Sequence, residues 1–101
     1  MTRHEQLRHE AQKFHDEHPD VWDLFVRFSF EKIRQGFPHY SADSVMHRVR
    51  WETGAGDSEG WKINNNYVAL YARRFMRAYP AHRGFFRTRK QKSEDQTARA
   101  W

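Results

Sequence analysis

Between positions 68 and 79, the apolar residues recur at the spacing of an α-helix. They stand at positions i, i+3, i+4, i+7, i+8 and i+11 and are Val68, Tyr71, Ala72, Phe75, Met76 and Tyr79. Because residues three and four apart share one side of a helix, this spacing predicts a helix from about Asn65 to Tyr79 with one buried face. Pro80 is its expected end, since proline has no backbone N–H to donate.

Three more helices are predicted along the chain. Residues 2–18 form a polar N-terminal helix with a narrow apolar stripe, and residues 19–36 hold a helix that is apolar on more than one face. The second of these is expected to be the central core helix, and Gly36 is its expected stop. Ser41 is the expected N-cap of a further helix that reaches about Thr53.

A glycine-rich segment separates the last two helices. Residues 53–60 contain three glycines, which excludes regular structure there. The segment is interpreted as a mobile loop or as the tip of a hairpin, since the short runs Val49–Trp51 and Trp61–Ile63 that flank it could pair as a small β-hairpin. Two helices joined in this way suggest a helix-turn-helix or winged-helix-like layout, with one helix placed to enter a DNA groove.

Length and composition fit one small domain. The chain has 101 residues, and aromatic residues make up 16% of it, so a few large side chains must form most of the core. We therefore expect a mainly α, compact helical domain over residues 1–92, with its basic half at 41–89. Residues 93–101 are polar and are expected to form a flexible tail.

Several classes of protein are excluded by what the sequence lacks. It has no cysteine, which excludes disulfides, thiolate zinc sites and a cysteine nucleophile. It shows no apolar leader and no apolar run of about eighteen residues. These features predict a cytoplasmic protein with no membrane partner.

Charge is divided unevenly along the chain. Residues 1–40 hold six Lys or Arg against seven Asp or Glu, whereas residues 41–92 hold eleven against four. The second half therefore carries a net charge of about +7, and such a field attracts polyanions. The near-neutral first half is expected to serve as scaffold.

The candidate binding residues come from the two C-terminal helices, the turn between them and the segment that follows. Arginine and asparagine side chains can contact both phosphates and base edges. The expected nucleic-acid-binding residues are Arg48, Arg50, Lys62, Asn64, Asn65, Asn66, Tyr67, Arg73, Arg74, Arg77, Arg87 and Arg89. The alternative is a solvated basic face on an ordinary helical domain.

Three consecutive asparagines open the last helix. Asparagine forms a bidentate pair with adenine, and the free N–H groups of a helix start bind phosphate, so Asn64, Asn65 and Asn66 beside Lys62 suit either contact. The structural alternative gives one asparagine to the cap, one to a turn and one to solvent.

Aromatic and histidine residues are open to two interpretations each. Most of the aromatic rings have core spacing, but Trp51 and Trp61 bracket the loop and are expected to be partly exposed, where they could stack on unpaired bases. His15 and His18 have a spacing that could place two imidazoles together, yet no HExxH pattern and no third ligand accompany them. We expect no metal and no cofactor.

Catalysis is also not expected. The basic half has only Asp43, Glu52, Asp57 and Glu59 as carboxylates, and the last two lie in the glycine-rich loop. Sites that hold divalent ions for hydrolysis need carboxylates in fixed positions. The sequence contains no nucleophile elbow, P-loop or dinucleotide-binding glycine run.

Several short runs in the second half are similar to runs found in known proteins. They are Ser41-Ala42, Val49-Arg50-Trp51, the run from Trp61 to Tyr67, Tyr71-Ala72-Arg73, Phe75-Met76, Pro80 and the run from Phe85 to Arg89. Over roughly residues 20–92 the chain resembles a group of small proteins encoded by bacteria and phages. That group has no established activity, so the resemblance implies an origin and no mechanism.

The sequence thus predicts a non-catalytic nucleic-acid-binding module with duplex DNA as its favoured ligand. The rival is a phage-type inhibitor or adaptor whose basic face docks on an acidic or nucleic-acid-binding host protein. A third reading is binding of RNA or single-stranded DNA through Trp51, Trp61 and Tyr67. The sequence leaves the oligomeric state open.

Overall fold

Four α-helices and one short 3₁₀ turn account for the regular structure of the residues described below. The computed structural model describes residues 2–55 and 61–86. The helices are α1 (Arg3–Glu17), α2 (Pro19–Arg34), α3 (Ala42–Thr53) and α4 (Asn66–Ala78), and the 3₁₀ turn is Pro80–His82. The expectation of a mainly helical domain with about four helices is confirmed.

The helix ends follow the local signals in the sequence. The hydroxyl of Thr2 accepts a hydrogen bond from the N–H of Glu5 at 3.1 Å, and the Ser41 hydroxyl accepts one from the N–H of Ser44 at 3.2 Å. Both satisfy N–H groups that have no partner within their helix. Gly36 has a φ of +95°, which ends the run of α2 in a conformation that favours glycine.

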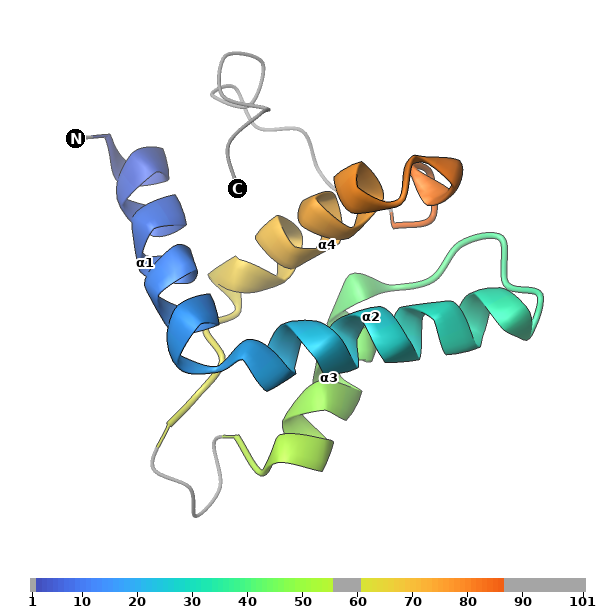
Figure 1. Cartoon of the computed structure of the whole chain (residues 1–101), viewed down its shortest axis with the longest axis horizontal. Coiled ribbons are helices and arrows are strands. Elements are labelled where there is room, and N and C mark those ends of the chain that lie inside the picture. Colours follow the sequence, from blue (N-terminus) through green and yellow to red (C-terminus); the bar gives the residue numbers. More distant parts are fainter. Residues whose placement is uncertain (1, 56–60, 87–101) are drawn as a thin grey trace.

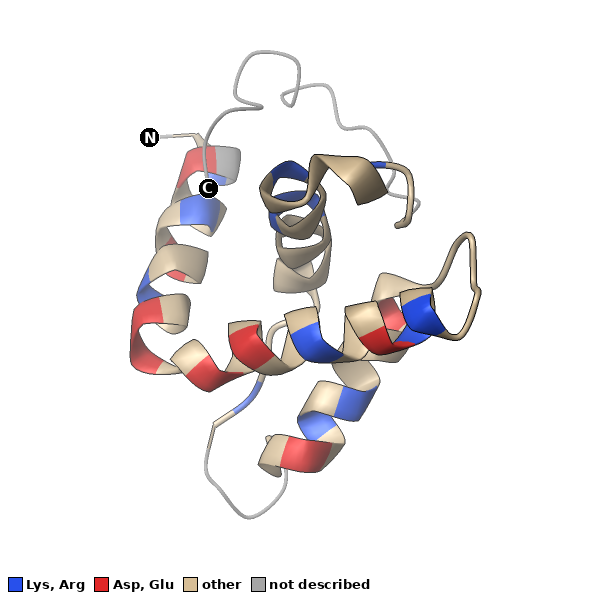
Figure 2. Cartoon of the chain, turned by 45° about the vertical axis from the view of Figure 1, so that its right-hand side comes forward, with Lys and Arg blue, Asp and Glu red and all other residues tan. Residues whose placement is uncertain are grey.

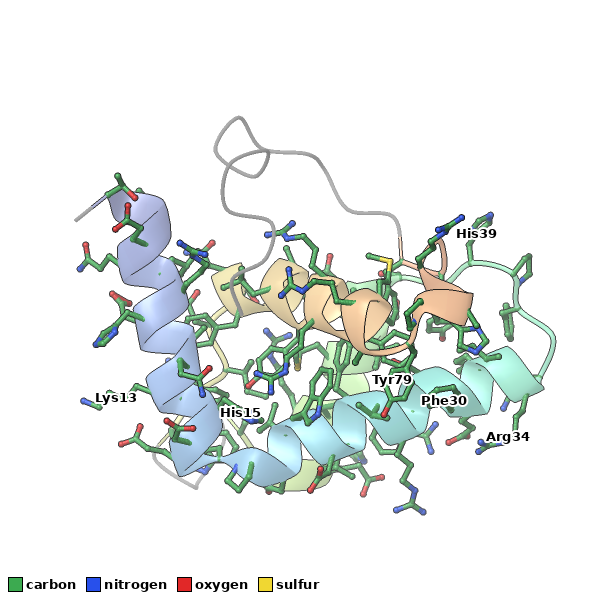
Figure 3. The ribbon with its side chains drawn as sticks, turned by 45° about the horizontal axis from the view of Figure 1, so that its top comes forward. Lys13, His15, Phe30, Arg34, His39 and Tyr79 are labelled. Carbon is green, nitrogen blue, oxygen red and sulfur yellow. The ribbon has the colours of Figure 1, made fainter. Side chains whose placement is uncertain are left out.

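The aromatic residues of α2 and α4 form the centre of the core. Phe25, Tyr71 and Phe75 are fully buried, and the ring centroids of Phe25 and Tyr71 lie 5.9 Å apart. Helix α2 crosses α3 and has α4 on its other side, and α1 packs at one end of this arrangement (Figure 1). At the other end of α2, the ring of Phe30 meets that of Tyr79 edge to face at 4.9 Å (Figure 3).

The last described residues close the domain. Phe85 and Phe86 are buried, and the N–H of Tyr40 donates to the carbonyl of Phe85 at 3.2 Å. Tyr40 and Phe86 form an isolated parallel bridge. This contact ties the segment between α2 and α3 to the residues that follow Gly84.

The expected hairpin is not present in the part of the chain that the structure describes. Val49–Trp51 belongs to α3, because Val45, Met46 and Val49 continue one buried helical face into that run. Trp61–Ile63 has no strand partner among residues 2–55 and 61–86. The pairing predicted from two three-residue runs was therefore wrong.

The connections between helices have unequal lengths. A single residue, His18, joins α1 to α2, seven residues (35–41) join α2 to α3, and twelve residues (54–65) join α3 to α4. The turn of a helix-turn-helix has about three or four residues. Neither of the two long connections has that length.

Two expectations fall on residues that are not described. The predicted tail at 93–101 and the basic residues Arg87 and Arg89 lie outside the described ranges. Within those ranges, no helix is both long enough and apolar enough to span a bilayer.

Candidate nucleic-acid interface

Arg48 of α3 is held against α2. Its Nη1 donates to Glu31 Oε1 at 2.9 Å, and its guanidinium lies 4.1 Å from the centroid of the Phe28 ring. The hydrogen bond from Arg48 is the main cause that holds the pKa of the Glu31 carboxyl below its ordinary value. Arg48 therefore joins two helices, which is a structural role.

Arg50 of α3 is held against the segment that leads into α4. Its Nη2 donates to the carbonyl oxygen of Ile63 at 3.2 Å and to Asn65 Oδ1 at 2.7 Å. Because Ile63 is buried, these bonds fix the path of the chain just before α4. The guanidinium of Arg50 is thus engaged by the protein itself.

The three asparagines have three different environments. Asn64 Oδ1 accepts a hydrogen bond from the N–H of Asn66 at 2.8 Å, in the manner of an Asx turn that starts the helix. Asn65 stands at the N-cap position without a capping bond from its side chain, which instead binds Arg50. Asn66 is the first residue of α4 and is exposed.

Tyr67 belongs to the core. It is buried, and its ring centroid lies 5.3 Å from that of Phe14 on α1. Burial, followed by the nearby charge of Glu10, raises the pKa of its hydroxyl. Its expected role as a ligand-contacting ring is replaced by packing between α1 and α4.

The two tryptophans beside the loop differ in exposure. Trp51 on α3 is 82% exposed, whereas Trp61 is half-buried. The Trp61 indole stacks on the imidazole of His18, with ring centroids 4.0 Å apart. Exposure of both residues is confirmed, and Trp51 is the more exposed of the two.

One side of α4 carries further basic residues. Asn66, Arg73 and Arg77 stand at i, i+7 and i+11, so they follow one line along the helix, which we call the α4 row. Asn66 and Arg77 are exposed and Arg73 is half-buried. Lys62 is also exposed and lies just before the start of α4, where Asn66 is the first helical residue.

Arg74 lies on the flank of α4 that faces α1 and α2. Its guanidinium sits 5.0 Å from the ring centroid of Trp22. His15 meets the same indole edge to face at 6.5 Å and points inward from α1, whereas Lys13 points outward (Figure 3). Burial first, and the charge of Arg74 second, lower the pKa of His15.

A basic residue from the first half of the chain joins those of α4. Burial, and then the charges of Arg73, Arg74 and Arg8, lower the pKa of Arg77. Both α1 and α4, which pack on each other, carry blue segments in Figure 2. We call Arg8, Arg73, Arg74 and Arg77 the arginine cluster.

Arg8 was missed because it lies in a near-neutral segment with no run of bases around it. Its spacing of seven residues from His15 was the available signal, since it puts both on one side of α1. Among the described residues, no three His, Asp or Glu side chains gather where they could hold a metal ion.

The comparisons with known proteins add no assignment: no family model, no curated protein and no solved structure matches the chain.

Proposed function

We propose that this protein is a non-catalytic nucleic-acid-binding module that takes duplex DNA along α4. The observation that carries the proposal is the α4 row, with Lys62 at its start and Arg74 on its flank. Asn66 to Arg77 spans about 16 Å at 1.5 Å per residue, which matches several phosphates at about 3.4 Å per base pair of one strand.

In this proposal α3 does not bind DNA, although its residues Arg48 and Arg50 were expected to do so. Arg48 and Arg50 hold α2 and the start of α4, so their role is to position α4. The major groove admits an α-helix, and the exposed side of α4 offers the amide of Asn66 and the guanidinium of Arg77. In the most specific form of this proposal, α4 enters that groove as the recognition helix of a helix-turn-helix protein does.

Salt dependence of binding is the primary test. Fluorescence anisotropy of a labelled random duplex should give an affinity that falls about 40-fold between 50 and 200 mM salt, if three phosphates are neutralised. The double variant Arg73→Ala/Arg77→Ala should lose much of this slope. The control Arg27→Ala/Arg34→Ala removes the same charge from exposed positions on α2, and it should keep the salt dependence of the wild type. Absence of binding at 50 mM salt would contradict the proposal.

Base readout is tested separately from phosphate contact. Asn66→Ala should weaken discrimination between duplex sequences, because its amide is exposed at the start of α4. Lys62→Ala should weaken binding to duplexes of all sequences equally. Asn64→Ala serves as the control for loss of the turn, since its side chain already bonds to the N–H of Asn66.

A second candidate function, docking on an acidic or nucleic-acid-binding protein, is favoured by Trp51. An indole that is 82% exposed suits a protein interface, where tryptophan often dominates the binding energy. Retention of a stoichiometric protein from nuclease-treated lysate, lost in Trp51→Ala while duplex affinity is unchanged, would favour this function. If a single-stranded oligonucleotide quenches the tryptophan fluorescence of the wild type but not that of Trp51→Ala, a single-stranded ligand is favoured instead.

A further inference from the structure

The segment between α2 and α3 and the turn after α4 lie side by side, at the end of α2 that is far from α1 (Figure 1). His39 Nδ1 lies 3.1 Å from the carbonyl oxygen of Gly84, and the N–H of Tyr40 donates to the carbonyl of Phe85 at 3.2 Å. The ring of His39 stands beside this turn (Figure 3). The α4 row therefore leads toward the residues that follow α2.

One aromatic ring in this region is open to solvent. Phe37 is 44% exposed, and its ring meets that of Tyr40 at 5.3 Å between centroids, with the planes 70° apart. The N–H of Phe37 donates to the carbonyl of Lys32 at 3.2 Å, which ties Phe37 to the last turn of α2. The ring thus presents apolar area to solvent from a backbone that is held on both sides.

Lys32 brings a positive charge to the same two rings. Its Nζ lies 5.6 Å from the ring centroid of Phe37 and 5.3 Å from that of Tyr40, and it donates to Gln35 Oε1 at 3.3 Å. Aromatic faces attract a cation, so the ammonium is held in position and keeps its charge. Because this side chain is already ordered, it loses less freedom when it binds an anion. An ammonium has three N–H donors, and Gln35 takes one of them.

The charge of this region is positive. Residues 32–41 and 77–86 contain no Asp or Glu. The carboxylate next to Lys32 in the sequence, that of Glu31, is bonded to Arg48 at 2.9 Å. The field around the exposed ring therefore attracts an anion.

Arg83 adds a guanidinium from the other segment. It is exposed and directly precedes Gly84, whose carbonyl oxygen lies against His39. Two positive charges thus reach this region from segments about fifty positions apart, with an exposed ring beside one of them. We call Lys32, Phe37 and Arg83 the α2-end patch.

We propose that the α2-end patch binds the sugar–phosphate backbone of the nucleic acid beyond the C-terminal end of α4, with a phosphate at Lys32, a deoxyribose against Phe37 and a neighbouring phosphate at Arg83. The identity of the ligand rests on the proposed function, whereas the patch itself rests on the contacts of residues 32–40. A backbone alternates charged phosphates with less polar sugars, which matches an ammonium beside an exposed ring. Such contacts fix the position of a protein on a duplex, so the patch fixes the position of α4 along it.

Lys32→Met is the direct test, with Lys13→Met as its matched control. Both remove one ammonium and keep an unbranched apolar side chain, and Lys13 is exposed on α1 and points outward (Figure 3). In fluorescence anisotropy at about 100 mM salt, the duplex affinity of Lys32→Met should fall about fivefold, and its salt slope should decrease by about 1. Lys13→Met should change the affinity less than about twofold, because salt screens a charge outside the interface.

Phe37→Ala separates the apolar contact from the charge. Its duplex affinity should fall about threefold with an unchanged salt slope, because no charge is removed. Trp51→Ala removes an exposed ring from α3 and should leave the duplex affinity unchanged. If far-UV circular dichroism shows that Lys32→Met is unfolded, Arg83→Gln at an exposed position should give the same loss of affinity and of slope.

Titration with deoxyadenosine monophosphate tests the α2-end patch without a duplex. Its phosphate and sugar should shift the NMR signals of the Phe37 ring and of the Lys32 side chain. Duplex binding that is equal in Lys32→Met and Lys13→Met overturns the patch and leaves the proposed function standing. Shifts with the mononucleotide, without duplex binding at any salt, support the patch and overturn the duplex as its ligand. Absence of both overturns the patch and the proposed function together.

Discussion

The imidazole of His18 lies flat on the indole of Trp61, with ring centroids 4.0 Å apart and planes 12° from parallel. Phe14 packs on both rings, at 4.9 Å from His18 and 6.0 Å from Trp61. The one residue that joins α1 to α2 is thus attached to the segment that leads into α4. This stack holds the start of the α4 row in place relative to α1.

Replacement of Trp61 should destabilise the fold. Trp61→Ala removes a half-buried ring and two aromatic contacts, so the free energy of unfolding should fall by about 2 kcal/mol. Urea denaturation followed by circular dichroism measures this change. Trp51→Ala is the control, because Trp51 is 82% exposed and its loss should leave stability within about 0.5 kcal/mol. Equal losses in both variants would contradict a structural role for the stack.

Arg50 and Asn65 should be energetically coupled. The bond from Arg50 Nη2 to Asn65 Oδ1 is 2.7 Å long and joins α3 to the N-cap of α4. A double-mutant cycle with Arg50→Ala and Asn65→Ala should give a coupling of about 1 kcal/mol in urea denaturation. Arg50→Ala alone should cost more than Asn65→Ala, because Arg50 also binds the carbonyl of Ile63. A coupling near zero would mean that this bond does not stabilise the fold.

Two glycines should respond differently to alanine. Gly36 has a φ of +95°. A Cβ added at Gly36 or at Gly84 would have no other atom within 4 Å, so neither substitution causes a clash. Gly36→Ala should therefore cost about 1 kcal/mol through backbone strain alone. Gly84→Ala should be neutral or stabilising by about 0.5 kcal/mol, because alanine reduces the entropy of the unfolded chain. Thermal denaturation shows which of the two variants is less stable. A loss of stability in Gly84→Ala as large as that in Gly36→Ala would contradict the prediction.

Acid should weaken the contact between α2 and α3. The hydrogen bond from Arg48 lowers the pKa of Glu31 below 4.5, its ordinary value. A carboxyl with a depressed pKa stabilises the folded state above its unfolded pKa and loses that contribution as the pH falls through its folded pKa. The stability difference between wild type and Glu31→Gln should thus shrink as the pH falls below about 4.5. Glu52→Gln, at an exposed position on α3, should show a smaller pH dependence of this difference.

The helices could be predicted because their signals are local. Ser41 caps α3 through the N–H of a residue three positions on, and Gly36 adopts the positive φ that ends α2. The false hairpin came from Val49–Trp51, a run too short to show its period by itself. Its helical identity depends on the buried face that begins at Val45.

The candidate site could be predicted only in part, because its charges are sorted by tertiary contacts. Arg50 and Arg77 look alike in sequence, yet one binds Ile63 and Asn65 while the other is exposed on α4. Arg8 acts on Arg77 only because α1 packs on α4, and the one signal for this in its own segment is the spacing of seven residues from His15. Counts of charge along the chain therefore located α4 and missed α1.

His15 should make stability depend on pH near neutrality. Its pKa is lowered by burial and next by Arg74, while Asp16 and Asp23 act in the opposite direction. A histidine with a depressed pKa binds its proton more readily in the unfolded chain, so the folded state loses stability as the pH falls through about 6.5, the ordinary value. The free energy of unfolding should thus rise between about pH 5.5 and 7.5 in the wild type and rise less in His15→Gln.

The control for His15 lies on the same helix. His9 is exposed, so His9→Gln should retain the slope of the wild type between these pH values. Urea denaturation at several pH values measures these slopes, and equal slopes in the wild type and His15→Gln would contradict the role of His15.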